Sequence, residues 1–261
     1  MTEPRRTRRI LRQHVETDRL LGVEAVPVNP PRQVPEEILS SSPAVSPVGV
    51  APDSLLPREP VPADAVGKAQ ALAELADEHA ANCNFCNHTN TGYTQIVFGE
   101  GDPAARLMVV GEGPGAEEDR QGRPFVGPSG ELLGKQLAAM GLSRERVYIA
   151  NVVKSRPPNN RTPTPAEAAD CGVYLQRQIE IIAPEVILTL GGPAAKLLLD
   201  TKEGVTRLRG RWHRYTAVDP PVAVMPTFHP AFLLRSYTPD NRRKVWEDLQ
   251  QVMERLGLPP K

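Results

Sequence analysis

Aromatic residues are scarce in this sequence, and no Phe, Tyr or Trp precedes Phe85. Proline is instead crowded between residues 27 and 62. A stretch of this composition cannot bury enough apolar surface to offset the entropy lost on ordering. We therefore expect residues 1–65 to form a disordered, Pro-rich N-terminal tail, with a short helix near Ile10–Leu21. Residues 66–261 have an ordinary size for a single folded domain.

Long apolar runs and an excess charge of one sign are also missing. No run approaches the roughly 20 residues that a membrane-spanning helix needs. The basic N-terminus has no apolar core of the kind that signal peptides carry. Because 31 Lys and Arg balance 31 Asp and Glu, affinity for a polyanion would depend on local basic clusters. Only three cysteines occur, which argues against a disulfide framework and leaves metal binding or simple burial. We expect a cytoplasmic protein.

Short apolar runs alternate with helical patterns after the tail. The predicted strands are Leu107–Gly111, Val147–Val152, Val186–Gly191 and Val222–Pro226. The predicted helices are Ala65–Ala81, Gly130–Met140, Pro165–Ile182, Pro193–Leu199 and Asp240–Leu256. This alternation is typical of βαβ units. It predicts an α/β fold, a three-layer α/β/α sandwich with a central, mostly parallel four-stranded sheet.

Polar residues lie at the ends of three of the four predicted strands, and Gly191-Gly192 lies at the end of the third. Glu112 lies in a glycine-rich segment after the first strand, Asn151 ends the second, and His229 follows the fourth. Ligands of such sheets bind outside the carboxyl ends of the strands. We therefore expect these side chains to converge on one rim and to form a site there.

Each of these residues also has a purely structural interpretation. The segment Gly111–Gly115 resembles a dinucleotide-binding turn only weakly, because Pro114 removes a backbone donor and acidic residues follow it. His229 could donate a hydrogen bond to a developing anion or serve the fold. Asn151 could match a base edge or bond to the backbone. Phe125 could stack on a base or anchor the core.

Cys83-Asn84-Phe85-Cys86 forms a C-x-x-C pair just ahead of the predicted sheet. Such a pair suggests metal or redox chemistry, but it needs further ligands to become a site. Cys171 is the one other thiol in the sequence.

Taken together, seven segments resemble the iron–sulfur, thermostable-type uracil-DNA glycosylases, known as family 4 of that superfamily. In chain order they are Cys83–Cys86, Thr94–Gly101, Gly111–Gly115 with Glu118-Asp119, Gly122–Gly127, Asn151–Lys154, Arg161–Pro165 and His229–Arg235. The match covers about Cys83 to Leu256 and leaves the tail unexplained. So many segments in the same order make a chance match very improbable.

The resemblance implies a role for each matching residue of the site. Glu112 would orient the attacking water and favour the cationic sugar, and His229 would hydrogen-bond uracil O2 as negative charge builds there. Asn151 would read the N3 and O4 edge of uracil, and Phe125 would stack on the flipped base. Glu118 would lie near uracil C5 and exclude the methyl group of thymine.

The resemblance also implies contacts with the base from the backbone and with the DNA duplex. Gly113 would help to bind the substrate. Phe232, Leu233 and Arg235 would contact DNA, and the loop Phe232-Leu233-Leu234-Arg235 could wedge into the gap that the flipped base leaves. The partner is uracil-containing DNA, and we expect a monomer.

The metal site departs from the family pattern at one position. The family has a Cys directly after Asn-Val-Val-Lys, and here Ser155 occupies that position. The implied [4Fe–4S] cluster therefore keeps the ligands Cys83, Cys86 and Cys171 but lacks a fourth thiolate. Three outcomes remain: a cluster with serine or an external oxygen on one iron, a three-iron cluster, or no cluster. His88 is a less favoured substitute ligand.

The leading hypothesis is a monofunctional enzyme that hydrolyses the N-glycosidic bond of uracil in DNA and initiates base excision repair. Some relatives trap the abasic sugar through a His in an inserted loop, but Arg156–Pro165 contains no His. One alternative is a non-catalytic DNA-damage-binding module on the same fold. Another is a nucleotide-binding protein that recognises phosphate at Gly111–Gly115.

Overall fold

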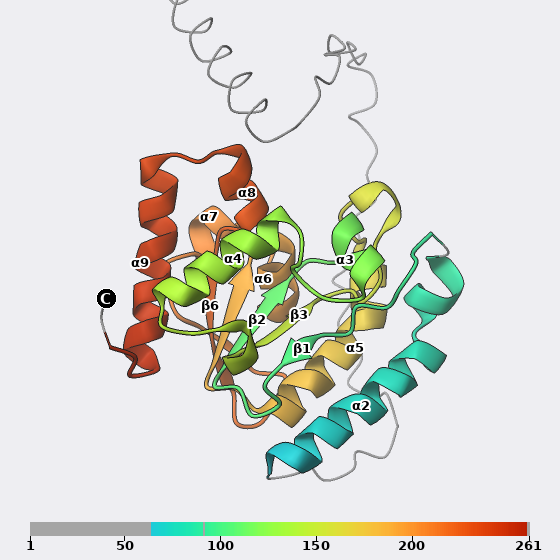
Figure 1. Cartoon of the computed structure of the whole chain (residues 1–261). Helices are drawn as coiled ribbons and strands as arrows, with labels where there is room; N and C mark the ends of the chain where they lie inside the picture. The colour runs from blue at the N-terminus through green and yellow to red at the C-terminus, as the bar shows by residue number, and fades with distance from the viewer. Residues whose placement is uncertain (1–63, 91, 260–261) are drawn as a thin grey trace, which may run out of the picture. The chain divides into compact units, whose positions relative to one another are not determined.

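The computed structural model describes residues 64–90 and 92–259 (Figure 1). The predicted disordered tail, apart from its last two residues, and the helix near Ile10–Leu21 lie outside these residues. The first described helix, α2, spans Ala65–Asn82, as predicted within a residue. Asp64 begins it, because its carboxylate accepts a hydrogen bond from the N–H of Gly67 at 2.7 Å.

A six-stranded sheet forms the centre of the domain, in the order β1-β3-β2-β4-β6-β5. Its four inner strands are β3 (Tyr148–Asn151), β2 (Leu107–Gly111), β4 (Val186–Leu190) and β6 (Val222–Thr227). These four strands are mutually parallel and correspond to the four predicted strands.

The predicted number of four strands is too low, because two short strands pair antiparallel at the edges. They are β1 (Glu100–Gly101) against β3 and β5 (His213–Tyr215) against β6. Strands of two and three residues are too short to show the alternation of side chains from which strands are predicted. The mostly parallel α/β fold is confirmed.

Helices cover both faces of the sheet (Figure 1). One face packs against α2, α5 (Pro165–Ile182) and α6 (Gly192–Leu198), and the other against α4 (Pro128–Ala139), α8 (Pro230–Arg235) and α9 (Pro239–Arg255). Neighbouring residues of β2 point to opposite faces, so Met108 joins the first core and Val109 the second. Both faces of the inner strands are therefore buried, which explains their unbroken apolar runs.

Several short elements connect these layers. They are the π-helix Phe85–Thr89, α3 (Ala116–Gln121), the 3₁₀ turns Arg144–Arg146 and Pro158–Asn160, and α7 (Val205–Leu208). Among the described residues, no helix combines the length and the apolar character needed to cross a membrane.

Candidate active site

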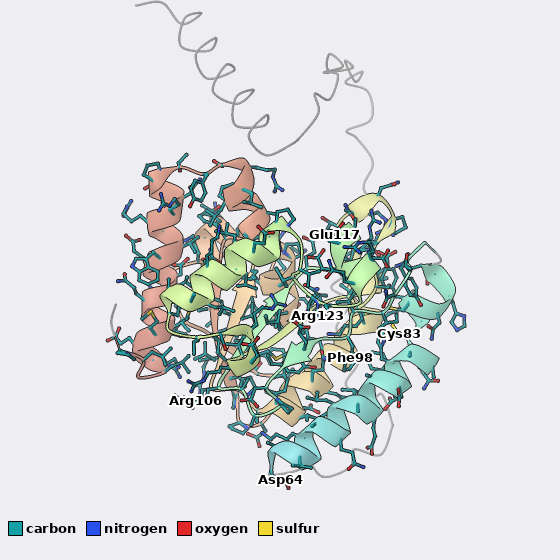
Figure 2. The ribbon with its side chains drawn as sticks, in the orientation of Figure 1. Asp64, Cys83, Phe98, Arg106, Glu117 and Arg123 are labelled. Carbon is teal, nitrogen blue, oxygen red and sulfur yellow. The ribbon has the colours of Figure 1, made fainter. Side chains whose placement is uncertain are left out.

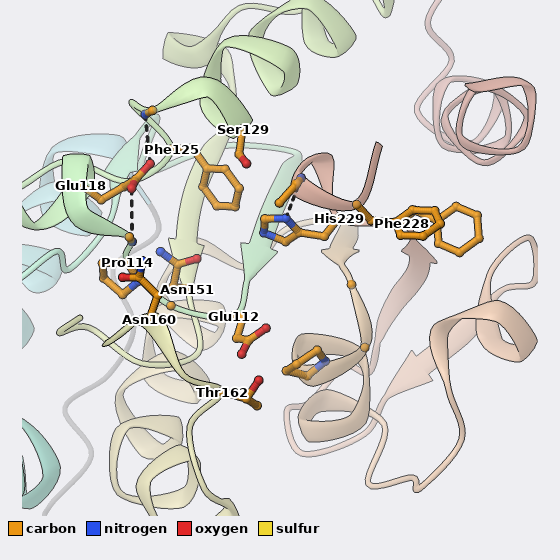
Figure 3. A pocket seen from close by; sticks show the side chains of 18 of the residues that line it. Glu112, Pro114, Glu118, Phe125, Ser129, Asn151, Asn160, Thr162, Phe228 and His229 are labelled. Atoms are coloured by element: carbon orange, nitrogen blue, oxygen red, sulfur yellow. Dashed lines mark hydrogen bonds between the residues drawn. The ribbon is translucent and has the colours of Figure 1, made fainter. Parts of the chain in front are cut away.

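The carboxyl ends of the four inner strands meet at one pocket, as the sequence predicts. Its walls come from Glu112–Glu118 after β2, Asn151 at the end of β3, Gly191–Pro193 after β4, and Phe228-His229 after β6. The cavity has a volume of about 970 Å³. Figure 3 shows Glu112, Phe125, Asn151 and His229 around a shared space. The structure thus brings together the four side chains that sequence reasoning singled out.

His229 is held at the start of α8 in a defined protonation state. Its Nδ1 accepts a hydrogen bond from the backbone N–H of Ala231 at 3.1 Å (Figure 3). An imidazole that accepts at Nδ1 carries its proton on Nε2 when it is neutral. Burial and, to a smaller extent, the positive charge of Arg235 lower the pKa of His229 to about 4. Near neutral pH the ring is thus a neutral donor whose free N–H is at Nε2.

This burial gives a testable pH dependence. In an NMR titration of the folded protein, the ring of His229 is expected to protonate with a midpoint near pH 4 rather than near 6.5. Between these values the unfolded chain binds a proton that the folded chain does not, so the free energy of unfolding falls as the pH is lowered through this range. The His229→Gln variant identifies the resonance by its loss. A midpoint near 6.5 would contradict the structure.

Asn151 presents an unused acceptor to the pocket. Its side chain is 1% exposed, and its Oδ1 is buried without a hydrogen-bond partner in the described part of the chain. A buried polar atom without a partner is costly, and such atoms are often reserved for a ligand. The backbone carbonyl of Asn151 accepts a hydrogen bond from Lys154 Nζ at 2.8 Å, which fixes the end of β3.

Gly111 makes room for both Asn151 and Phe125. A Cβ atom at position 111 would lie 2.4 Å from Asn151 Oδ1 and 2.5 Å from Phe125 Cζ, closer than real Cβ atoms approach. The absence of a side chain at the end of β2 therefore lets the amide and the aromatic ring share one wall of the pocket.

Phe125 has a strained backbone that its surroundings hold in place. Its φ is 54°, in the left-handed region that bulky residues avoid. The guanidinium of Arg144 donates to the carbonyls of Pro124 at 2.6 Å and Phe125 at 2.8 Å, and it pairs with Glu100. The Phe125 ring is 5% exposed and lies 5.7 Å from the His229 ring. It packs in the core and lines the pocket at the same time, so the two interpretations of this residue are compatible.

Glu118 ties two loops of the pocket together. Its Oε2 accepts a hydrogen bond from the N–H of Gly115, and its Oε1 accepts from the N–H of Gly127 (Figure 3). Oε1 also accepts from the N–H of Val126. The carboxylate thus lies in the pocket wall with its position fixed by backbone donors on both sides. Gly113 lies nearby, where a Cβ atom would be 2.7 Å from Val153 Cγ2.

The residues predicted to contact DNA divide into two groups. Leu233 is only 2% exposed and packs in the core, so the expectation that it wedges into DNA is corrected. Residues 230–235 form helix α8 rather than a loop, and this helix turns Leu233 inward and leaves Leu234 48% exposed. Phe232 and Arg235 line the pocket.

The three cysteines converge at the C-terminal end of α2, where Figure 2 marks Cys83. Their sulfur atoms lie close together, at 3.3 Å between Cys83 and Cys171 and 3.6 Å between Cys86 and Cys171. The hydrogen bond from Cys171 lowers the pKa of the Cys83 thiol well below its usual range. Three thiols buried together in this way form a donor set that suits a metal group.

The fourth residue of this group is a histidine that sequence reasoning missed. His79 lies with the three cysteines, and the four ligand atoms are within 4.8 Å of one another. His88, the substitute ligand that the sequence suggests, is exposed on the π-helix, so that expectation is corrected. The residues present are compatible with a metal or iron–sulfur site.

Comparisons with known proteins point to one family. Residues 98–250 match the family described as the uracil DNA glycosylase superfamily. The chain is 47% identical to the Type-4 uracil-DNA glycosylase of Thermotoga maritima over 185 residues, which cover 70% of this chain and 94% of the relative. It is 43% identical to the Type-4 uracil-DNA glycosylase of Sulfurisphaera tokodaii over 193 residues, which cover 72% of this chain and 86% of the relative.

Proposed function

Because the chain belongs to the type-4 uracil-DNA glycosylases of the uracil DNA glycosylase superfamily, we propose that Glu112, Asn151 and His229 carry out its reaction. The protein is a uracil-DNA glycosylase, a hydrolase that removes uracil from DNA and initiates base excision repair. The observation that carries the residue assignment is the convergence of an unpaired amide acceptor and a neutral imidazole donor on one pocket.

The reaction breaks the bond between uracil N1 and sugar C1′. The bonding electron pair leaves with the base, so the sugar becomes cationic and uracil becomes an anion whose charge spreads onto O2. Water then adds its oxygen to C1′, and the proton that it loses is balanced by protonation of the uracil anion, so the products are neutral uracil and an abasic sugar. The target nucleotide must first leave the base stack, because C1′ cannot be reached in a closed duplex.

His229 and Glu112 act on the two charges that develop. The Nε2–H of His229 donates to uracil O2, and a fixed donor of this kind contributes about 3–4 kcal/mol to the transition state. The carboxylate of Glu112 points into the pocket, where it stabilises the cationic sugar and orients the attacking water (Figure 3).

Asn151, Phe125, Gly113 and Glu118 recognise the base. Asn151 Oδ1 accepts from uracil N3–H and Nδ2 donates to O4, whereas cytosine presents an acceptor at N3 and a donor at N4. Phe125 stacks on the base, and Gly113 allows close approach of the backbone. Glu118 excludes the methyl group of thymine at C5. The three backbone donors that fix its carboxylate support this last role, since an immobile group discriminates by shape.

DNA binds over α8 and the start of α9. Arg235 and Lys244 line the mouth of the pocket and can neutralise phosphates, while Leu234 is exposed beside them. We propose Phe232 and Arg235 as DNA contacts, with Leu234 in place of Leu233 as the apolar wedge. One chain supplies the whole pocket, which supports a monomer.

The resident cofactor is proposed to be an iron–sulfur cluster bound by Cys83, Cys86 and Cys171. The burial of all three free thiols in one group supports this assignment. A cluster there would supply a rigid link between α2 and α5, and no step of the reaction passes through it. Thiols stay reduced in the cytoplasm, which is the compartment that we propose.

A direct test is uracil release from a single-stranded oligonucleotide that contains one uracil, with cytosine and thymine oligonucleotides as controls. We expect release of free uracil alone, with an abasic site left in the strand. Tight binding of the oligonucleotide without base release would instead favour the non-catalytic DNA-damage-binding module.

The close packing of the Asn151 amide and the Phe125 ring against Gly111 gives a further expected result. A Gly111→Ala variant should lose about tenfold to 100-fold in kcat/KM, because its Cβ displaces the Asn151 amide and the Phe125 ring from their positions. Gly134→Ala is the matched control, since a Cβ at that helical position meets nothing within 4 Å. Equal activity of the two variants would contradict the proposed use of this wall.

A further inference from the structure

Four buried donor atoms, rather than three, surround one point between α2 and α5. Cys83, Cys86 and Cys171 are each at most 1% exposed, and His79 is fully buried beside them. His79 Nε2 lies 3.5 Å from Cys86 Sγ and 3.7 Å from Cys171 Sγ. The imidazole thus completes a set of four donors around the thiol group.

The remainder of the His79 ring is in apolar surroundings. It packs edge-on against Tyr174 with ring centroids 4.8 Å apart, and it lies 5.7 Å from the Phe98 ring. Its Nδ1 is buried without a hydrogen-bond partner in the described part of the chain. A histidine with thiols as its polar neighbours is poorly satisfied as a structural residue, and a metal bond to Nε2 would compensate for this burial.

Ser155 is already engaged elsewhere. It is fully buried, and its hydroxyl oxygen accepts a hydrogen bond from Asn90 Nδ2 at 2.8 Å. A neutral hydroxyl whose oxygen already accepts a hydrogen bond is a weak metal ligand compared with a thiolate or an imidazole. Ser155 is therefore not expected to replace the missing thiolate.

We propose that His79 is the fourth ligand of the metal centre, in place of the thiolate that position 155 does not provide. His79 and Cys83 are four residues apart at the end of α2, so they lie on the same face of the helix. The π-helix that follows brings Cys86 beside them, and α5 contributes Cys171 from the opposite side. The centre is then of the Cys3His type.

The donor set fits a metal group in number and in type. Three thiolates and one imidazole are ligands that both zinc and iron–sulfur clusters accept. The observed separations suit donors that converge on a single ion, whereas a cluster spreads its ligands because each binds a different iron. To bind the iron–sulfur cluster of the proposed function, the four side chains must therefore adopt rotamers that place their donor atoms farther apart around the same centre.

An imidazole ligand changes the charge of the centre and hence its reduction potential. Replacing one thiolate by a neutral imidazole removes one negative charge, which favours the reduced state of a cluster. The cluster of this chain is therefore expected to have a higher potential than that of a His79→Cys variant. A serine ligand would leave the potential unaffected by changes at position 79.

The experiment compares the full chain with its His79→Ala, His79→Cys and His88→Ala variants, all purified anaerobically. Iron, zinc and sulfide are counted per chain, the midpoint potential is measured, and electron spin-echo spectroscopy of the reduced cluster detects nitrogen bound to iron. We expect a nitrogen signal in the parent protein and its loss in His79→Cys, together with a lower potential. His79→Ala should lose metal, and the exposed control His88→Ala should match the parent protein.

Other results have defined meanings. Metal content and nitrogen signal that are unchanged in both His79 variants would overturn the assignment, as would a parent protein that binds no metal. One zinc per chain that is lost in His79→Ala would support His79 as a ligand and reject the iron–sulfur cluster. Uracil release is assayed in the same preparations. Its absence from metal-loaded protein would count against the proposed function and leave the ligand assignment intact.

Discussion

Replacement of His229 by alanine is expected to lower kcat for uracil release by about 100-fold to 1,000-fold, with a much smaller change in KM. The imidazole donates to an oxygen whose negative charge develops only as the glycosidic bond breaks, so its loss weakens the transition state more than the bound substrate. Single-turnover kinetics on a uracil-containing oligonucleotide measure this effect without interference from product release.

A loss of activity in His229→Ala could also come from a loss of stability, because His229 caps the start of α8. Its Nδ1 caps the helix, and loss of such a cap costs about 1 kcal/mol of stability. A His229→Asn variant keeps an acceptor for the N–H of Ala231 but shortens the side chain, so it should stay folded and remain slow. His88→Ala serves as the control for a change at an exposed histidine. Full activity of His229→Asn would exclude the proposed hydrogen bond to O2.

The layout of the site follows from features that are visible in the sequence. The four inner strands are continuous apolar runs because both of their faces are buried, and the ends of parallel strands necessarily share one rim. The positions of Glu112, Asn151 and His229 at strand ends are therefore sufficient to predict that these residues surround one pocket.

Other features depend on contacts that no local pattern contains. Leu233 and Leu234 are chemically alike, and the orientation of α8 alone decides that the first is buried and the second exposed. Lys154 is fully buried and bonded to Gln178 across the fold, although lysine is among the residues least often buried. Its burial lowers the pKa to about 7.

His79 is an intermediate case. Its spacing of four residues before Cys83, followed by the C-x-x-C pair, is a readable signal for a shared helix face. His79 is not an immediate sequence neighbour of either Ser155 or Cys86, the two positions near which a substitute ligand is first expected. What the sequence could not show is that the helix end and the centre of α5 meet.

Substitution of Asn151 by aspartate is expected to reduce kcat/KM for uracil by about 1,000-fold or more. The change exchanges the Nδ2 donor for a carboxylate oxygen, which then faces the acceptor O4 of uracil and repels it. A buried site built around a hydrogen bond discriminates strongly when that bond is lost, because the polar groups of both partners remain unpaired. The Asn151→Ala variant also lacks the hydrogen bond to O4, but it introduces no repulsion. Its activity should therefore lie between those of the aspartate variant and the parent.

The order of these two variants distinguishes base recognition from a structural role of Asn151. If the amide served only to pack the end of β3, the isosteric aspartate would be better tolerated than alanine. If it reads the N3 and O4 edge, aspartate is the worse replacement, because it presents an acceptor where a donor is required. The bond from Lys154 Nζ goes to the backbone carbonyl of Asn151 and is retained in both variants. Thermal unfolding checks that each variant is folded, and the buried carboxylate is expected to make the aspartate variant the less stable of the two. If the Asn151→Asp variant released uracil from DNA faster than the Asn151→Ala variant, the proposed contact with O4 would be ruled out.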